Sequence, residues 1–177
     1  MPSHRSLGNV IADSLQLGIA QAERLLTNVT ADQFARFGRP GGQTVESNHA
    51  AFIFGHLSLY GPRIVEQLGG DDSTIKISER FQSLFSANAK CQDDPDGTIY
   101  PPMEVITQFF FQGYRVAVET LRAAKDETLE QPNPAGGRMA ELFPTLGSMH
   151  NFYCGGHLML HLGQLSAWRR MRGLGPA

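Results

Sequence analysis

The chain has 177 residues and a mass of 19.4 kDa, which is enough for one domain with a sizeable core and short for two. A hydrophobic content of 41% and a charged content of 18% are ordinary for a globular protein, and the net charge of −2 gives no electrostatic reason to bind nucleic acid or an anionic membrane. No stretch approaches the roughly 20 apolar residues of a membrane span, the start of the chain does not have the pattern of a secretory signal, and two cysteines are too few for a disulfide framework. We therefore expect one cytoplasmic domain over residues 1–177, with no nucleic-acid or membrane partner.

Four segments show the spacing of apolar residues that is typical of helices. The first is expected over residues 7–26, and the second over residues 45–68, where two glycines signal the end of the helix. Residues 30–44, which contain Pro40-Gly41-Gly42, are expected to form a loop between them. The expected buried positions of the first helix are Leu7, Val10, Ile11, Leu15, Ile19, Leu25 and Leu26.

The longest connection, residues 69–102, contains a strong turn signal at 93–97 and is expected to include a short helix within 75–85. A connection of this length can carry the chain along a whole bundle, so the second and third helices can run parallel. The third helix is expected over residues 103–124. Its inner stripe is Met103, Ile106, Phe110, Tyr114, Ala117 and Leu121.

The fourth helix is expected to begin near Thr145, which is a suitable N-cap, and to end at Gly173. No segment shows the alternating pattern of a strand. The sequence therefore predicts an all-α protein with four main helices and a long connection between the second and the third.

Histidines gather on two of the predicted helices. His157 and His161 are four residues apart, so they lie on one helical face and can converge on a metal ion at distances of about 2 Å. His56 lies among apolar residues of the second helix and is expected to point inward, where it needs a partner. Taken alone, His56 also fits a neutral core histidine that bonds to a backbone carbonyl. The full set is His4, His49, His56, His150, His157 and His161.

Several motifs in the sequence resemble a known family. The motif of the second helix is Asn48-x6-Gly55-His56-Leu57. Those of the fourth helix are Thr145-Leu146-Gly147-Ser148 and His157-x3-His161-Leu162-Gly163-Gln164-Leu165. The tail Arg169-Arg170-Met171-Arg172-Gly173-Leu174-Gly175-Pro176 and the segment Asp126-Glu127-Thr128-Leu129 add to the likeness. Together they resemble the DinB/YfiT-like proteins of bacteria.

The resemblance implies a four-helix bundle in an up-down-down-up arrangement, often a homodimer. It also implies a metal site formed by His56, His157 and His161. Proteins of this family are described as metal-dependent hydrolases, or as transferases and isomerases that use a low-molecular-weight thiol. Many relatives have an acidic residue directly after the first histidine of the last pair, where this chain has Leu158. A nucleophile would then be activated by the metal itself or by a residue elsewhere.

Other side chains near these positions have two interpretations each. His49 and His150 lie seven residues before His56 and His157, which is about 10 Å along a helix. This distance favours a pocket-wall or capping role for each of them. If the two helices were parallel, His49 and His150 would instead come together as a second site. Cys154 suits a small buried residue better than a fourth zinc ligand. Tyr60 suits a packing role better than donation of its hydroxyl to a metal-bound ligand, and Gln164 can bond either to a metal ligand or to a neighbouring helix.

The sequence leaves three functional hypotheses. The first is a metal-dependent enzyme, either a hydrolase or a low-molecular-weight-thiol transferase, which acts on a small-molecule substrate or thiol and whose catalytic residues are unknown. The second is a non-catalytic metal- or ligand-binding bundle of a stress response. The third is a structural bundle that binds metal only adventitiously. Three imidazoles suit zinc or nickel, with iron as a further candidate.

Overall fold

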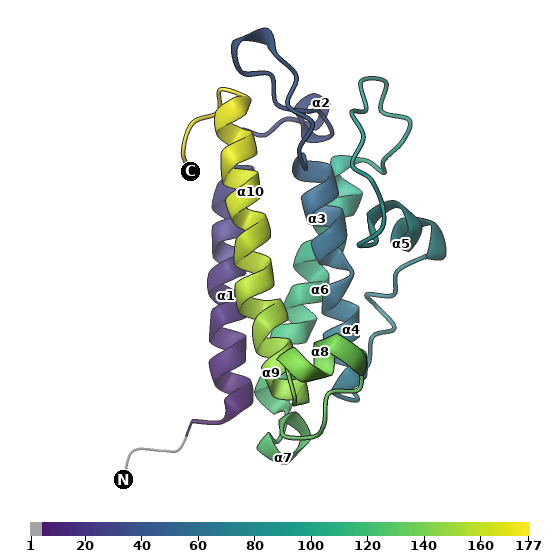
Figure 1. Ribbon diagram of the computed structural model, residues 1–177, viewed down its shortest axis with the longest axis vertical. Helices are drawn as coiled ribbons and strands as arrows, with labels where there is room; N and C mark the ends of the chain where they lie inside the picture. Colours follow the sequence, from purple (N-terminus) through teal and green to yellow (C-terminus); the bar gives the residue numbers. More distant parts are fainter. Residues whose placement is uncertain (1–4) are drawn as a thin grey trace.

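The computed structural model of the chain describes residues 5–177, so His4 lies outside the described residues. Within that range the chain is all-helical, and its only β-type pairings are isolated bridges. Four long helical segments lie side by side, and short helices lie near their ends or along one side (Figure 1). No helix in the described range is long and apolar enough to cross a membrane.

The first helix, α1 (Leu7–Leu26), has the predicted bounds, and the hydroxyl of Ser6 caps it by accepting from the Asn9 amide. The predicted burial of Leu7 and Val10 was wrong, because these side chains are 43% and 51% exposed. Small residues on α1 are buried and let neighbouring segments approach closely, which turns the larger side chains beside them outward. The buried face is Gly8, Ile11, Ala12, Leu15, Gly18, Ala22 and Leu25.

The segment that was expected to be a loop contains a short helix, α2 (Ala31–Phe34), and a 3-10 turn, η1 (Pro40–Gly42). The next helix was expected from residue 45 but begins later, as α3 (Ala50–Ser58). The intervening residues are held out of the helix because the Val45 amide donates to the Gly38 carbonyl at 2.9 Å.

The predicted second helix is also interrupted. It breaks at Leu59 and continues as α4 (Tyr60–Gln67). Pro62 has no N–H to donate to the Ser58 carbonyl, which accounts for the break. The junction between α3 and α4 therefore comes just after His56, one of the three histidines of the predicted metal site.

The connection after α4 contains the expected short helix, α5 (Glu79–Phe85). The third long helix, α6 (Met103–Ala123), follows two prolines as predicted. Its predicted stripe is buried except for Met103, which is partly buried. On this stripe Phe110 packs edge-to-face against Phe54 of α3, with ring centroids 4.8 Å apart.

Two short helices, α7 (Asp126–Leu129) and α8 (Gly137–Leu142), precede the last long segment. That segment begins as α9 (Leu146–Asn151), and Thr145 is its N-cap, as predicted. It then widens into a π-helical segment, η2 (Phe152–His157), and ends as α10 (Leu158–Met171).

The C-terminal end of α10 is tied to the end of α1 by a buried arginine. The guanidinium of Arg169 is 2% exposed and donates to the carbonyls of Leu25 and Thr27, both at 2.7 Å. Arginines in the last turn of a helix generally complement its dipole. The structure shows that Arg169 also closes the C-terminus of another helix.

Candidate metal centre

Three histidine side chains from two segments far apart in the sequence meet at one point. The Nε2 atom of His157 lies 3.4 Å from that of His56 and 3.2 Å from that of His161. One ligand atom from each of the three lies within 4.8 Å of the others. The structure therefore brings together the three residues named from the sequence, and this group can hold a metal ion.

Local backbone structure sets the position of each ring. His56 is in the last turn of α3, just before the break at Leu59. His157 is at the end of the π-helical segment, and His161 follows one turn later in α10. π-helical segments are rare, but many of those that occur are at functional sites. Their wider turn changes the direction in which the following side chains point. Here that change falls at the first histidine of the pair.

Hydrogen bonds fix which ring nitrogen of His56 carries the proton. Its Nδ1 lies 2.8 Å from the carbonyl oxygen of Phe85, at the end of α5. A carbonyl only accepts, so Nδ1–H donates and the Nε2 lone pair of neutral His56 is left facing the other two rings. This is the arrangement by which proteins orient a histidine ligand toward a metal.

The same logic applies to His161. Its Nδ1 donates to Oε1 of Gln164 at 3.0 Å, and that oxygen also accepts from Nδ2 of Asn48 at 3.3 Å. Gln164 thus bonds to His161 and to Asn48, in the segment just before α3. The Nε2 lone pair of neutral His161 is left free to bind a metal.

His157 differs from the other two histidines in the hydrogen bonding of its Nδ1 atom. Its Nδ1 is buried and has no hydrogen-bond partner among the described residues. Burial, followed by the neighbouring His161 and His56, lowers the pKa of His157 to about 3. Burial also lowers the pKa of His56 and of His161. All three rings are therefore neutral at pH 7, which is the form that binds metal.

The spacing of the three nitrogens fits a metal ion. The lone pairs of His56 and His161 both face His157 Nε2, and one proton on that atom can serve only one of them. Without an ion, the Tyr60 hydroxyl, 3.3 Å from His56 Nε2, can donate to the other. Three nitrogens bound at about 2.0–2.1 Å in tetrahedral geometry are about 3.3 Å apart. The two Nε2 separations, 3.4 and 3.2 Å, bracket that value.

A pocket of about 570 Å³ lies beside His56 and gives the site access to small molecules. The hydroxyl of Tyr60, one turn after His56, lies 3.3 Å from His56 Nε2. The ring of Tyr60 also packs beside that of His157, with centroids 4.5 Å apart. Tyr60 therefore lines both the cluster and the pocket.

Three other candidates from the sequence lie outside the cluster. His49 caps α3 by accepting from the Phe52 amide and lies 2.8 Å from the Gln92 carbonyl, as a capping role predicts. His150 is fully buried, and neither ring nitrogen has a partner in the described part of the chain. Cys154 is buried, and burial raises the pKa of its thiol. No second histidine site forms among the described residues.

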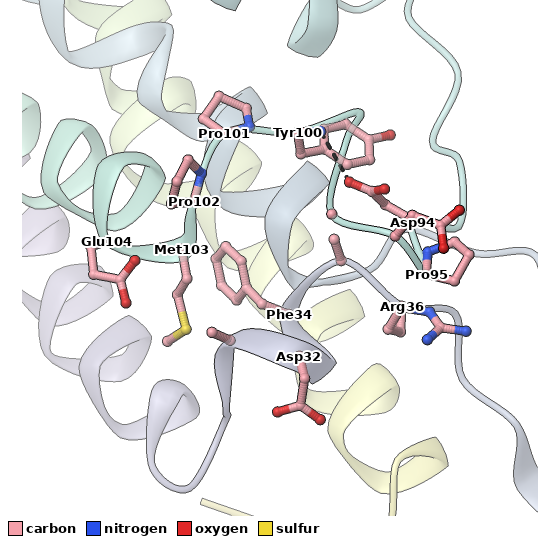
Figure 2. Close-up of a pocket in the computed structure, with 14 residues that line it drawn as sticks. Asp32, Phe34, Arg36, Asp94, Pro95, Tyr100, Pro101, Pro102, Met103 and Glu104 are labelled. Atoms are coloured by element: carbon pink, nitrogen blue, oxygen red, sulfur yellow. Dashed lines mark hydrogen bonds between the residues drawn. The ribbon is translucent and has the colours of Figure 1, made fainter.

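A separate pocket of about 470 Å³ lies between α2 and the start of α6 (Figure 2). Its most buried carboxylate, Asp94, accepts from the backbone amides of Thr98, Ile99 and Tyr100 and so holds the loop before α6. The charge of Asp94 therefore has a structural role. The lining residues include none of the three histidines.

Two features of the site were missed at the sequence level. The carbonyl of Phe85 has no side-chain signal, because any residue supplies a backbone oxygen. Arg63, which lines the pocket with His56 and Tyr60, was detectable. It lies seven residues after His56 and three after Tyr60, and such spacings put residues on one face of a helix.

The bond from His161 to Gln164 predicts a graded effect on metal affinity. Gln164→Leu removes the acceptor and is expected to weaken zinc binding by about 10–100-fold. Gln164→Glu keeps an acceptor oxygen at the same reach and is expected to stay close to wild type. Competition with a chromophoric chelator measures both affinities. Wild-type affinity in Gln164→Leu would show that this bond does not orient the ligand.

The comparisons with known proteins add no assignment to this geometry. No protein-family model, no curated protein and no solved structure matches the chain.

Proposed function

We propose that the chain binds one divalent metal ion through the Nε2 atoms of His56, His157 and His161, and that it is a metal-dependent enzyme of the DinB-like kind. One observation carries the proposal: two of the three facing nitrogens hold lone pairs fixed by hydrogen bonds at their Nδ1 atoms. Zinc or nickel is the preferred ion, with iron as a further candidate, because imidazole binds all three.

Three protein ligands leave a coordination position for a small molecule, which is typical of catalytic zinc sites. When bound, the metal would supply Lewis-acid chemistry, which suits either hydrolysis or transfer of a low-molecular-weight thiol. His56 and Tyr60 line the pocket through which a substrate would reach it. Tyr60 can donate its hydroxyl proton to a bound substrate atom, since burial raises its pKa and keeps it protonated at pH 7.

A non-catalytic metal- or ligand-binding bundle is the alternative, and one observation favours it. Among the described residues, no carboxylate belongs to the cluster or bonds to its rings. Leu158, which occupies the position after His157, is buried and cannot act as a base. Panels of thiol-conjugation and esterase substrates, run with the metal-loaded protein, separate the enzyme from the binding protein.

The fold proposal is a four-helix bundle with up-down-down-up topology. Close approaches between helices support it: Gly8, at the start of α1, lies against Leu121, at the end of α6. The C-terminal ends of α1 and α10 also lie together, where Arg169 bonds to the Leu25 carbonyl, which supports a parallel arrangement of these two helices. We also propose a homodimer, which is consistent with exposed apolar side chains on the first and last helices. These are Val10, Leu17, Met159 and Leu160.

Elemental analysis of tag-free protein tests the metal proposal. Wild type is expected to retain about one zinc or nickel ion per chain after reconstitution and dialysis, and His157→Ala is expected to retain none. His56→Ala is also expected to lose the ion, because His56 belongs to the cluster.

His49→Asn is the matched control, because asparagine also caps a helix and His49 lies outside the cluster. It is expected to keep the wild-type stoichiometry. Equal losses from His56→Ala and His49→Asn would contradict the site. Absence of bound metal from reconstituted wild type would overturn both the enzyme and the metal-binding alternative.

A further inference from the structure

The pocket beside the three histidines is lined by two cations and two carboxylates. One wall comes from the α3–α4 junction and carries His56, Tyr60 and Arg63. Lys76 also lines the pocket, and Glu66 and Asp72 are its two carboxylates. At about 570 Å³ the pocket is in the size range of small-molecule sites.

The ligand set itself brings no negative charge. A divalent ion on three neutral imidazoles keeps its full charge, whereas carboxylate or thiolate ligands would cancel part of it. Arg63, which is positively charged, lies on the same pocket wall as His56. The loaded site is therefore electron-poor on the side that faces the pocket, and it favours an anion.

Arg63 is available to receive that anion. Its guanidinium carbon lies 5.6 Å from the centre of the Tyr60 ring, a cation–π distance that holds the side chain against the pocket wall. Arg63 is exposed and forms no ion pair with a carboxylate in the described range. The contact with Tyr60 is a cation–π contact and not a hydrogen bond, so the N–H groups of the guanidinium stay free to donate.

We propose that the pocket takes a small organic acid and that Arg63 binds its carboxylate, beside the metal held by the histidines. This proposal rests on the metal site of the proposed function and adds the substrate class. A planar carboxylate matches the two parallel N–H groups of a guanidinium. A carboxylate fits better than a phosphate, because the one guanidinium matches its single negative charge. A phosphate dianion would need a second cation, and the other pocket cation, Lys76, is offset by Glu66 and Asp72.

The test uses protein loaded with cobalt(II), whose visible absorption changes when a ligand enters its coordination shell. Titration of wild type with acetate is expected to give a saturable spectral change, and inorganic phosphate is expected to bind more weakly. Arg63→Ala is expected to weaken acetate binding by about 10-fold or more, because it removes the paired, charge-assisted hydrogen bonds of the guanidinium. Arg63→Lys keeps the charge but not the paired donors, so it is expected to fall in between.

Arg115→Ala is the matched control. Arg115 is also exposed and lies over an aromatic ring, 5.8 Å from the centre of Phe111, but it does not line this pocket. It is expected to leave acetate binding unchanged. Cobalt affinity of Arg63→Ala is expected to equal or exceed that of wild type, because a positive charge is removed. A merely structural role for Arg63 would instead weaken both cobalt and acetate binding.

The outcomes separate the two proposals. Equal acetate affinity in wild type and Arg63→Ala, with cobalt still bound, would overturn the role of Arg63 and leave the metal site intact. Tighter binding of phosphate than of acetate would overturn the substrate class. Failure of wild type to bind cobalt at all would overturn the proposed function, and the present proposal with it.

Discussion

Replacing Gly8 with alanine is expected to destabilise the chain by about 3 kcal/mol, at the upper end of the usual range for overpacking. A Cβ at this position would lie 2.0 Å from the carbonyl oxygen of Leu121 and 3.1 Å from its carbon. These are backbone atoms of α6, so a side-chain rotation cannot relieve the overlap. The two helices would have to move apart, and their apolar contacts would be lost.

Chemical denaturation monitored by circular dichroism measures this effect. Gly163→Ala is the matched control, because Gly163 lies in α10 and a Cβ there meets nothing within 4 Å. That substitution is expected to stabilise the chain by up to about 1 kcal/mol, since alanine is the better helix former. If the two variants changed the free energy of unfolding alike, the close approach of α1 and α6 would be wrong.

Replacing Arg169 with methionine is expected to cost about 3 kcal/mol or more. The guanidinium donates to the carbonyls of Leu25 and Thr27, and more weakly to that of Leu174 at 3.4 Å. Charge-assisted bonds contribute about 1.5–3 kcal/mol each, and the carbonyls left behind at a buried helix end are costly to leave unpaired. Methionine fills a similar volume, so the lost bonds and not a cavity dominate the change.

Arg170→Met is the control for this prediction. Arg170 is exposed and its guanidinium bonds only to Ser166 of its own helix. Its replacement is expected to change the free energy of unfolding by no more than about 0.5 kcal/mol. Thermal or urea unfolding of both variants checks the pair. A loss of similar size in Arg170→Met would mean that charge at this terminus, and not the buried bonds, provides the stability.

Local signals in the sequence predicted the long helices well. The bounds of α1 and α6 and the N-cap at Thr145 follow from apolar spacing and capping residues, which act within a few positions of the chain. The start of α3 was predicted wrongly, because the pairing of Val45 with Gly38 depends on how the chain folds back. The break at Leu59 had a local signal, Pro62, which the apolar pattern obscured.

The site was predictable to a similar degree. The spacing of His157 and His161 placed them on one face, whereas His56 needed the resemblance to a family, since a buried histidine alone also fits a core position. The partners that fix their protonation were beyond the sequence. The oxygen that orients His56 belongs to the backbone of Phe85, and only the packing of α5 against α3 brings it there.

The distance along the chain between His56 and His157 has a consequence for folding. These residues are 101 positions apart, so an ion held by both closes a loop of most of the chain. Closing a loop of about 100 residues removes conformational freedom from the unfolded chain that corresponds to about 4.7 kcal/mol in the chain-entropy model. In the proposed metal-bound state the ion thus acts as a reversible cross-link between the two halves of the polypeptide. A chelator would cut that link without breaking a covalent bond.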